Sequence, residues 1–309
     1  MEKIIAPVPI KLLEQELTED KFIRHTNYGN NMIYSVTCHD SPNIIQEIGR
    51  LREYTFRKAG GGTGKKIDID QFDTADKPYY QLIVWDPQRK SILGGYRYIL
   101  PDNMVKDKDG NVVLATSRLF KYSEKFKKDY LPFMIELGRS FVQPAYQSTQ
   151  SSRKGIFALD NLWDGLGALT VDNPEVKYFF GKVTMYPDFN VEARNLILYF
   201  IEKHFGDKNN LLTLIDPLII NHNVNEYNKI FNTETYPDNY KILSQKVRAL
   251  GEKIPPLVNA YMNLSPTMRS FGTSINPYFG NVEETAIMIT IKDMYKSKSS
   301  RHILSYKKK

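Results

Sequence analysis

Residues 79–100 read YYQLIVWDPQRKSILGGYRYIL, and this stretch decides the fold class. Two runs rich in β-branched and aromatic residues, 79–85 and 92–100, flank the polar sequence Asp86-Pro87-Gln88-Arg89-Lys90. Runs of this composition on either side of a proline-containing turn are typical of two antiparallel strands. The pattern therefore predicts a hairpin whose second strand carries Arg97 in the sequence Gly94-Gly95-Tyr96-Arg97.

Predicted helices and strands alternate around this hairpin. Ser41-Pro42-Asn43, followed by apolar residues at helical spacing, predicts the start of a helix, and residues 60–64 predict a flexible glycine loop after it. Further expected elements are a strand at 133–142, a helix at 156–169, a strand at 176–185, helices at 191–205, 238–250 and 255–264, and a strand at 284–291. This order is typical of a mixed β-sheet with helices packed on it, an α+β or α/β fold.

Charged residues inside the apolar, strand-like text predict a polar site. Asp70-Gln71-Phe72-Asp73 precedes the hairpin, Arg97 lies in it, Glu136-Leu137-Gly138-Arg139 lies in the next predicted strand, and Arg52 lies upstream. Burying a charge costs free energy unless an opposite charge pairs with it, so these groups are expected to contact one another. These charges also have simpler interpretations without a functional site. Glu136 could form a structural ion pair with Arg97 or Arg139, and Asp70 and Asp73 could lie in a solvated turn.

Glu136 is the candidate proton acceptor of this site, because a carboxylate beside a cleft can take a proton from a nucleophile directly or through water. Arg139 lies three residues further along the same predicted strand. Strict alternation would turn it to the opposite face, unless a bulge at Gly138 turns it back.

Composition and charge narrow the class of protein. The chain has 309 residues and one cysteine, Cys38, which excludes an intramolecular disulfide and a four-cysteine metal site and fits a reducing cytoplasm. Its five histidines lack metal-ligand spacing, so no metal site is expected. No secretory signal and no run of about 20 apolar residues is visible, which favours a soluble or surface-bound protein.

Most of the net charge of +7 comes from the C-terminal segment 292–309, which holds seven Lys and Arg residues and one Asp. Such a segment suits an acidic partner or an anionic membrane surface. A frayed, solvated terminus is the simpler interpretation. Nucleic acid is not expected as a partner, because the basic residues are not interleaved with aromatic ones along a single element.

The order and spacing of these motifs resemble a known superfamily. Arg52 with Phe56, the 70–73 motif, Gly95-Tyr96-Arg97 and Glu136-Leu137-Gly138-Arg139-Ser140 resemble the core of the acyl-homoserine-lactone autoinducer synthases. They resemble still more the ornithine-lipid and glycine-lipid N-acyltransferases, sometimes labelled hemolysin-like. Both groups are GNAT acyltransferases. The resemblance to the second group continues through residues 162–166, 178–181, 255–261 and 276–280, and covers roughly residues 35 to 292.

The resemblance implies a GNAT-like mixed β-sheet with helices on both faces, followed by a helical C-terminal extension. The expected parts are an N-terminal extension (1–34), the acyltransferase core (35–215), a C-terminal extension packed on the core (216–291) and a basic tail (292–309). The implied reaction moves a fatty acyl chain, 3-hydroxylated or not, from acyl carrier protein to the α-amine of a small amino acid, glycine or ornithine, in aminolipid synthesis.

The resemblance also assigns roles to residues. It implies acyl carrier protein as partner, with its acyl-phosphopantetheine as co-substrate and no bound cofactor, and a cytoplasmic location, peripheral on the membrane or not. The catalytic residues would be Glu136, Arg97 and Arg139. Binding of the acceptor, under a lid formed by the first helix and its glycine loop, would fall to Arg52, Phe56, Asp70 and Asp73. The thioester oxygen and the phosphopantetheine would be held by Ser140, Val142, Arg153 and Lys154.

Two other functions stay open at this point. An autoinducer-type synthase would use S-adenosylmethionine as acyl acceptor, but that family resembles only the first two-thirds of the chain. A non-enzymatic protein could bind a membrane surface through its basic tail. Replacing Glu136 distinguishes an enzyme from such a binding protein.

Overall fold

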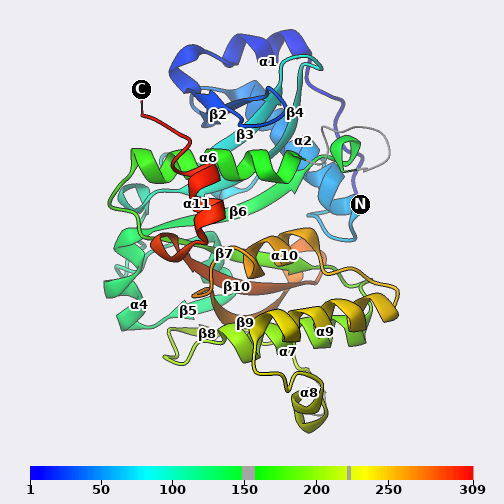
Figure 1. The fold of residues 1–309 in the computed structure, drawn as a ribbon. Helices are drawn as coiled ribbons and strands as arrows, with labels where there is room; N and C mark the ends of the chain where they lie inside the picture. Colours follow the sequence, from blue (N-terminus) through cyan, green and yellow to red (C-terminus); the bar gives the residue numbers. More distant parts are fainter. Residues whose placement is uncertain (148–156, 221–223, 309) are drawn as a thin grey trace. The chain divides into compact units, whose positions relative to one another are not determined.

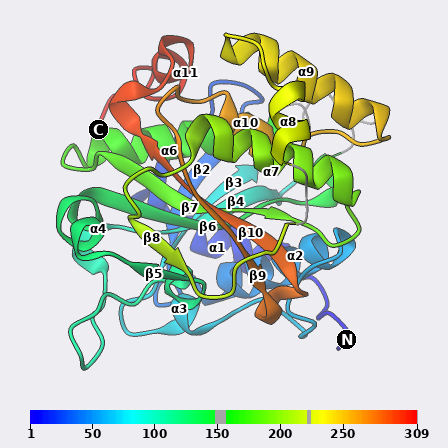
Figure 2. The ribbon, with the colours of Figure 1, turned by 90° about the horizontal axis from the view of Figure 1, so that it is seen from below.

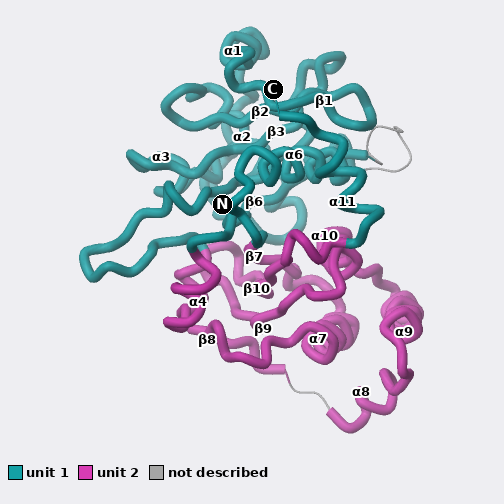
Figure 3. The backbone as a smooth tube through the Cα atoms, turned by 60° about the vertical axis from the view of Figure 1, so that its left-hand side comes forward, with its two compact units in different colours: residues 1–115, 132–179, 295–309 teal, residues 116–131, 180–294 magenta. Residues whose placement is uncertain are grey.

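The computed structural model describes residues 1–147, 157–220 and 224–308. Internal contacts divide the chain into two compact units, which are coloured separately in Figure 3. Unit 1 comprises Met1–Ala115, Pro132–Phe179 and Tyr295–Lys309, and unit 2 comprises Thr116–Leu131 and Phe180–Met294. Each unit is described by itself below.

Unit 1 is built on an antiparallel sheet with the strand order β1-β2-β3-β4-β6 (Figure 1). Its strands are β1 (Phe22–His25), β2 (Met32–Val36), β3 (Tyr80–Asp86), β4 (Ser91–Ile99) and β6 (Met134–Val142). The hairpin expected at 79–100 is confirmed as β3 and β4, which pair from Tyr80 opposite Tyr98 to Asp86 opposite Ser91. The strand expected at 133–142 is β6, and it pairs with β4.

Helices cover both faces of this sheet (Figure 1 and Figure 2). Neighbouring residues of a strand point to opposite faces. Leu82 of β3 lies against Gly165 of α6 (Ala158–Asp172), whereas Gln81 hydrogen-bonds to Asp73, which is itself bound by Arg52 of α2 (Pro42–Lys58). The helices α2 and α6 therefore lie on opposite faces of the sheet. The other helices of unit 1 are α1 (Ile10–Glu16), α3 (Gln71–Thr74) and α11 (Lys296–His302).

The helix expected after Ser41 is α2, but its N-terminus is not capped by Ser41. The Ser41 hydroxyl hydrogen-bonds to Asp40 instead. The first amides of the helix, those of Asn43 and Ile44, donate to the two carboxylate oxygens of Glu16, at 3.0 and 2.8 Å. A carboxylate from α1 thus satisfies the free N–H groups of α2 and complements its dipole.

The end of the basic tail is folded onto unit 1. His302 of α11 is 2% exposed, and its Nδ1 lies 2.7 Å from a carboxylate oxygen of Asp164 on α6. Arg301 forms an ion pair with Asp160 of the same helix. A Cβ at Gly167 would lie only 2.0 Å from the His302 carbonyl oxygen, so the two helices approach closely. The simple interpretation of residues 292–309 as a frayed terminus is therefore wrong for this helix.

Unit 2 contains the remaining strands and helices. Its strands are β7 (Tyr178–Met185, of which the first two residues belong to unit 1), β9 (Arg269–Asn276), β10 (Val282–Thr290), β5 (Phe120–Tyr122) and β8 (Leu212–Leu214). The order β7-β10-β9 forms one group and β5-β8 another. Its helices are α4 (Glu124–Asp129), α7 (Val191–Phe205), α8 (Val224–Ile230), α9 (Tyr236–Ala249) and α10 (Pro256–Met262). Strand β9 was not predicted, because its sequence RSFGTSIN is largely polar.

Short 3-10 helices connect several of these elements: Glu19–Lys21, Pro101–Asn103, Ala115–Arg118, Leu131–Phe133, Pro144–Tyr146, Pro277–Phe279 and Ile291–Asp293. The predicted fold class, a GNAT-like mixture of sheet and packed helices, is confirmed. The domain boundaries expected after residues 34, 215 and 291 stay predictions. Among the described residues, no helix combines the length and the apolar character needed to cross a membrane.

We predict that Gly94→Ala strongly destabilises unit 1. A Cβ at this position of β4 would lie 2.3 Å from the backbone carbonyl oxygen of Phe141, and a backbone atom in a sheet cannot move aside. We expect a loss of about 3 kcal/mol, measured as a lower melting temperature by calorimetry. Gly138→Ala on the neighbouring strand is the matched control, because no described atom lies within 4 Å of its Cβ position. Equal melting temperatures of the two variants would contradict the prediction.

Candidate active site

Arg52 of α2 is the centre of a buried ion cluster. Its side chain is 1% exposed, and its two Nη atoms bind the two carboxylate oxygens of Asp73 at 3.1 and 2.9 Å. Its Nε lies 3.1 Å from Asp68, whose backbone carbonyl also accepts from Nη2. The planar guanidinium suits such a two-pronged contact, and both carboxylates are almost fully buried. Arg52 therefore fixes the segment 68–73 against α2.

The motif Asp70-Gln71-Phe72-Asp73 forms the start of α3 and binds a second arginine. The Asp70 carboxylate accepts from the Phe72 amide and Asp73 accepts from the Asp70 amide, which is a capping box. Arg97 of β4 lies 2.7 Å from Asp70 and 3.2 Å from Asp73 through the same Nη1 atom. Its guanidinium also lies over the rings of Phe72 and Tyr79. The motif is thus a helix cap and an arginine-binding site at once.

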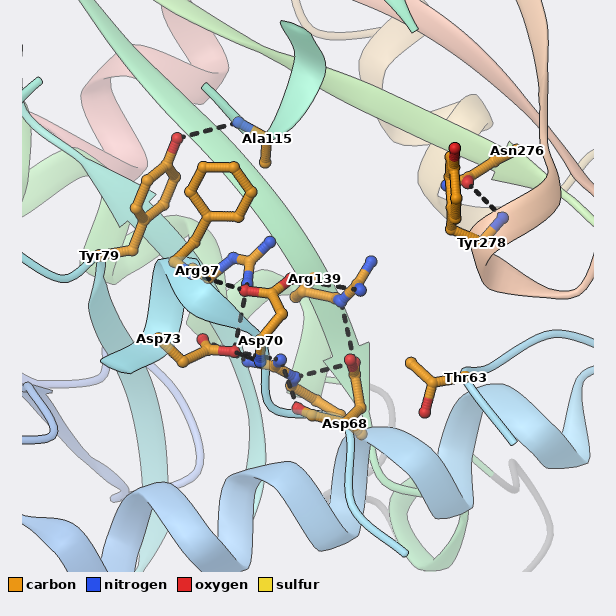
Figure 4. A network of polar contacts seen from close by, with 12 residues as sticks. Thr63, Asp68, Asp70, Asp73, Tyr79, Arg97, Ala115, Arg139, Asn276 and Tyr278 are labelled. Atoms are coloured by element: carbon orange, nitrogen blue, oxygen red, sulfur yellow. Dashed lines mark hydrogen bonds and ion pairs between the residues drawn. The ribbon is translucent and has the colours of Figure 1, made fainter. Parts of the chain in front are cut away.

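Arg139 reaches the same cluster through a β-bulge in β6. Gly95 pairs with Phe141 and Arg97 pairs with Gly138, so two residues of β6 lie opposite one residue of β4. Arg139 has a φ of +49°, in the left-handed region. Its Nε lies 2.8 Å from Asp68 and its Nη2 3.7 Å from Asp70, and Figure 4 shows the side chain directed from its strand to Asp68. In a regular strand Arg139 would face the opposite side of the sheet; the bulge turns it to the side of Arg97 and the ion cluster.

Glu136 lies on the same face but in a separate contact. Glu136 pairs with Ile99, and each of these two residues lies two positions along its strand from the pair of Arg97 and Gly138. Residues two apart in a strand face the same side, so Glu136 faces the same side as Arg97. Its carboxylate is 1% exposed and accepts from the Tyr79 hydroxyl and, at 3.2 Å, from the Ala115 amide. Tyr79 connects it to the cluster, because Arg97 lies 5.3 Å from the centre of the tyrosine ring.

Electrostatics hold the cluster in its charged form. Burial alone would raise the pKa of Asp73, but the charges of Arg52 and Arg97 outweigh it and hold that pKa far below its usual range. Burial opposes the charge of Asp68 in the same way, and Arg139 and Arg52 lower its pKa on balance. Burial and the charge of Glu136 raise the pKa of Tyr79 well above its usual value, so its hydroxyl stays protonated and acts as a donor.

The other residues expected at the site are placed as follows. Phe56 is buried on α2, one turn after Arg52. Ser140, in the bulge, and Val142, beyond it, lie half-buried on β6, and Val142 pairs with Gly94. Arg153 and Lys154 lie outside the described residues. Arg52, Asp70, Asp73, Arg97 and Arg139 are therefore brought together, Glu136 joins them through Tyr79, and the roles expected for all of them stay predictions.

Two residues of the site were missed in the sequence. Asp68 bridges Arg52 and Arg139, and its signal was the alternating sequence Ile67-Asp68-Ile69-Asp70, which repeats a carboxylate at strand spacing. Tyr79 opens the hairpin sequence and was counted only as an apolar strand residue.

The glycine loop after α2, expected to be flexible, is held by Glu53. This fully buried carboxylate accepts from the amides of Thr63 and Gly64, at 2.9 and 2.8 Å, and from the Thr63 hydroxyl at 2.7 Å. Arg57, one turn later on the helix, also donates to it. The loop is therefore tied to the helix that carries Arg52.

The cluster predicts a specific dependence of stability on pH. A depressed carboxylate pKa in the folded state stabilises the protein above the unfolded pKa of about 3.9, and this contribution is lost as the pH falls below that value. Asp73→Asn leaves Arg52 and Arg97 without their shared partner and should cost about 3 to 5 kcal/mol at pH 7. Urea unfolding of both proteins at pH 7 and pH 3 measures the difference, which should shrink at pH 3.

Asp70→Asn is the control for this prediction, because Asp70 is 21% exposed and an asparagine can still cap α3. It should cost clearly less than Asp73→Asn at pH 7. A larger cost for Asp70→Asn, or a difference for Asp73→Asn that grows on acidification, would contradict the assignment of Asp73 as the buried partner.

Comparisons with known proteins identify the family of the chain. A model of the acetyltransferase (GNAT) domain matches residues 51–154, which include all eight charged residues expected at the site. A solved structure of "a COA-dependent acyl-homoserine lactone synthase, BjaI, with SAM and isopentyl-CoA" is 15% identical and covers 53% of this chain and 72% of that one. The TM-score of this match is 0.31.

Two curated proteins match along nearly their whole length, and both are named glycine N(alpha)-acyltransferase. The protein from Phocaeicola vulgatus is 56% identical over 308 residues, which cover 100% of this chain and 94% of the relative. The protein from Bacteroides thetaiotaomicron is 56% identical over 306 residues, which cover 99% and 91%. The chain therefore belongs to the family of GNAT acyltransferases that includes these two glycine N(alpha)-acyltransferases.

Proposed function

We propose that the protein transfers a fatty acyl chain from the phosphopantetheine thioester of acyl carrier protein to the α-amine of glycine. The observation that carries this proposal is the face of the sheet that holds a carboxylate, Glu136, together with the guanidinium groups of Arg97 and Arg139. An α-amino acid carries one positive and one negative group, and this face offers a counterpart to each. The names of the two curated relatives support glycine as the acceptor over ornithine.

In the proposed reaction Glu136 takes a proton from the glycine ammonium, directly or through water, because only the free amine has a lone pair for attack. The amine nitrogen attacks the thioester carbon and forms the C–N bond. A backbone amide of residues 140–142, at and beyond the bulge in β6, holds the oxygen as it becomes negative. The nitrogen then gives up its second proton, the C–S bond breaks, and the departing thiolate takes up that proton. Glu136 releases the first proton to solvent, so the products are N-acylglycine, free phosphopantetheine thiol and one proton.

Charge supports an acidic carrier protein as donor. The protein has a net charge of +7, and a basic surface raises the rate of encounter with an acidic partner. Lys296, Lys307 and Lys308 of the C-terminal segment are exposed. The same lysines would attract a cytoplasmic enzyme to an anionic membrane. The amphiphilic product, an aminolipid or its precursor, would pass into that membrane.

The direct test incubates the purified protein with an acyl thioester and an amino acid, followed by mass spectrometry. We expect N-acylglycine from acyl carrier protein and glycine, with a higher kcat/KM than from acyl-coenzyme A. Ornithine in place of glycine should give little product. An acyl-homoserine lactone formed with S-adenosylmethionine, or no acylated product from fully folded protein, would contradict the proposal.

We predict that Glu136→Gln lowers kcat/KM by about 10²- to 10⁴-fold without unfolding the protein. The glutamine oxygen can still accept from Tyr79 and Ala115, but it cannot take a proton. Glu124→Gln, at a surface carboxylate 89% exposed on α4, is the matched control and should leave the rate unchanged. A rate within threefold of the wild type for Glu136→Gln would contradict its role.

Tyr79→Phe tests the phenol as a positioning residue. Removing the hydroxyl takes away a donor that stabilises the charged carboxylate of Glu136. We expect a smaller loss of kcat/KM than for Glu136→Gln, with kcat reduced and KM for glycine unchanged. An unchanged kcat would show that Tyr79 has only a packing role.

A further inference from the structure

Neither the backbone conformation nor the packing at position 138 of β6 requires a glycine. It is absent from the residues with positive φ, so an L-residue fits its backbone without strain. No described heavy atom lies within 4 Å of the position that a Cβ would take. The glycines of the adjoining strand differ, because a Cβ at Gly94 or Gly95 would lie 2.3 or 2.7 Å from a backbone oxygen. The missing side chain at 138 therefore leaves open space inside a half-buried stretch of the sheet.

Charged groups border this space. Arg97 pairs directly with Gly138, so both residues face the same side of the sheet. Glu136, two positions earlier on the same strand, faces that side as well. Arg139 follows Gly138, and the bulge turns its guanidinium to Asp68 and Asp70 on this face, as Figure 4 shows.

The two guanidinium groups that border the space differ in exposure. Arg97 is 3% exposed, and its Nη1 lies within 3.2 Å of two carboxylates. Arg139 is 15% exposed, with Asp68 at 2.8 Å and Asp70 at 3.7 Å. Arg139 is thus the more accessible of the two to a small anion beside Gly138.

We propose that the open space at Gly138 is the subsite for the acyl acceptor and that the absent side chain admits it. The α-carbon of a small α-amino acid lies over Gly138, with its amine toward Glu136 and its carboxylate toward Arg139. The inference rests on the proposed function and deepens it, because it names the residue that sets the volume for the acceptor. A side chain at 138 would occupy the place of the acceptor's own α-carbon.

The experiment replaces Gly138 by Ala and by Val and measures KM for glycine and for the acyl donor separately. One methyl group in a binding site changes discrimination by about 10- to 200-fold. We expect kcat/KM for glycine to fall at least 10-fold for Gly138→Ala and further for Gly138→Val, mainly through KM for glycine. KM for the acyl donor should stay within twofold. The melting temperature of Gly138→Ala should equal that of the wild type, because its methyl group meets no described atom.

Gly110→Ala is the control, because a Cβ there also meets no described atom and the residue lies in an exposed turn away from the site. Its φ of +81° disfavours alanine and lowers stability slightly, but kcat/KM should stay unchanged. This control separates the effect of an added methyl group as such from its effect at the site.

The outcomes separate the inference from the proposed function. If the wild type acylates glycine and folded Gly138→Val keeps the wild-type KM for glycine, the inference is overturned. If KM for the acyl donor rises while KM for glycine does not, the space belongs to the thioester and the inference is overturned as well. If the wild type acylates no α-amino acid, the proposed function fails, and the acceptor subsite fails with it.

Discussion

The contact of Arg52 with Asp73 is the interaction on which the rest of unit 1 depends. Both side chains are 1% exposed, and a charge removed from water this completely is tolerated only with a partner in good geometry. Asp73 in turn accepts from Gln81 of β3 and from Arg97 of β4. One carboxylate therefore joins a helix, two strands and the start of α3, and it determines where the polar face of the sheet lies.

Register and a single bulge then decide which side chains share this face. The pairing of Arg97 with Gly138 puts Glu136 on the same side as the ion cluster, and the residue of positive φ that follows adds Arg139. In a regular strand Arg139 would face α6, where an unpartnered guanidinium would be buried against apolar side chains. The bulge thus combines a carboxylate and a partly exposed guanidinium within four residues of one strand.

Much of this could be predicted from the sequence, because charges inside apolar strands must find partners. The hairpin and the convergence of Arg52, Asp70, Asp73 and Arg97 follow from strand composition and the cost of burial. For Arg139 the sequence left two alternatives, a regular strand and a bulge near Gly138, and the structure has the bulge. The rest depends on contacts between distant segments, which local patterns do not contain. The contact of Tyr79 with Glu136, the cap that Glu16 gives to α2 and the contact of His302 with Asp164 belong to that class. Polar strand β9 had no periodic signal at all.

Exposure divides the cluster into fully buried and partly exposed charges. Arg52, Asp68 and Asp73 are almost fully buried, so a ligand could reach them only by breaking ion pairs that hold the segment 68–73 against α2. Asp70 and Arg139 are 21% and 15% exposed, and their charged groups lie 3.7 Å apart. The buried pairs hold these two groups in place, and the open position at Gly138 lies next to the second of them. This arrangement suits the acceptor subsite proposed above, because partly exposed charges that buried pairs hold in place need not reorganise when they contact a small zwitterion.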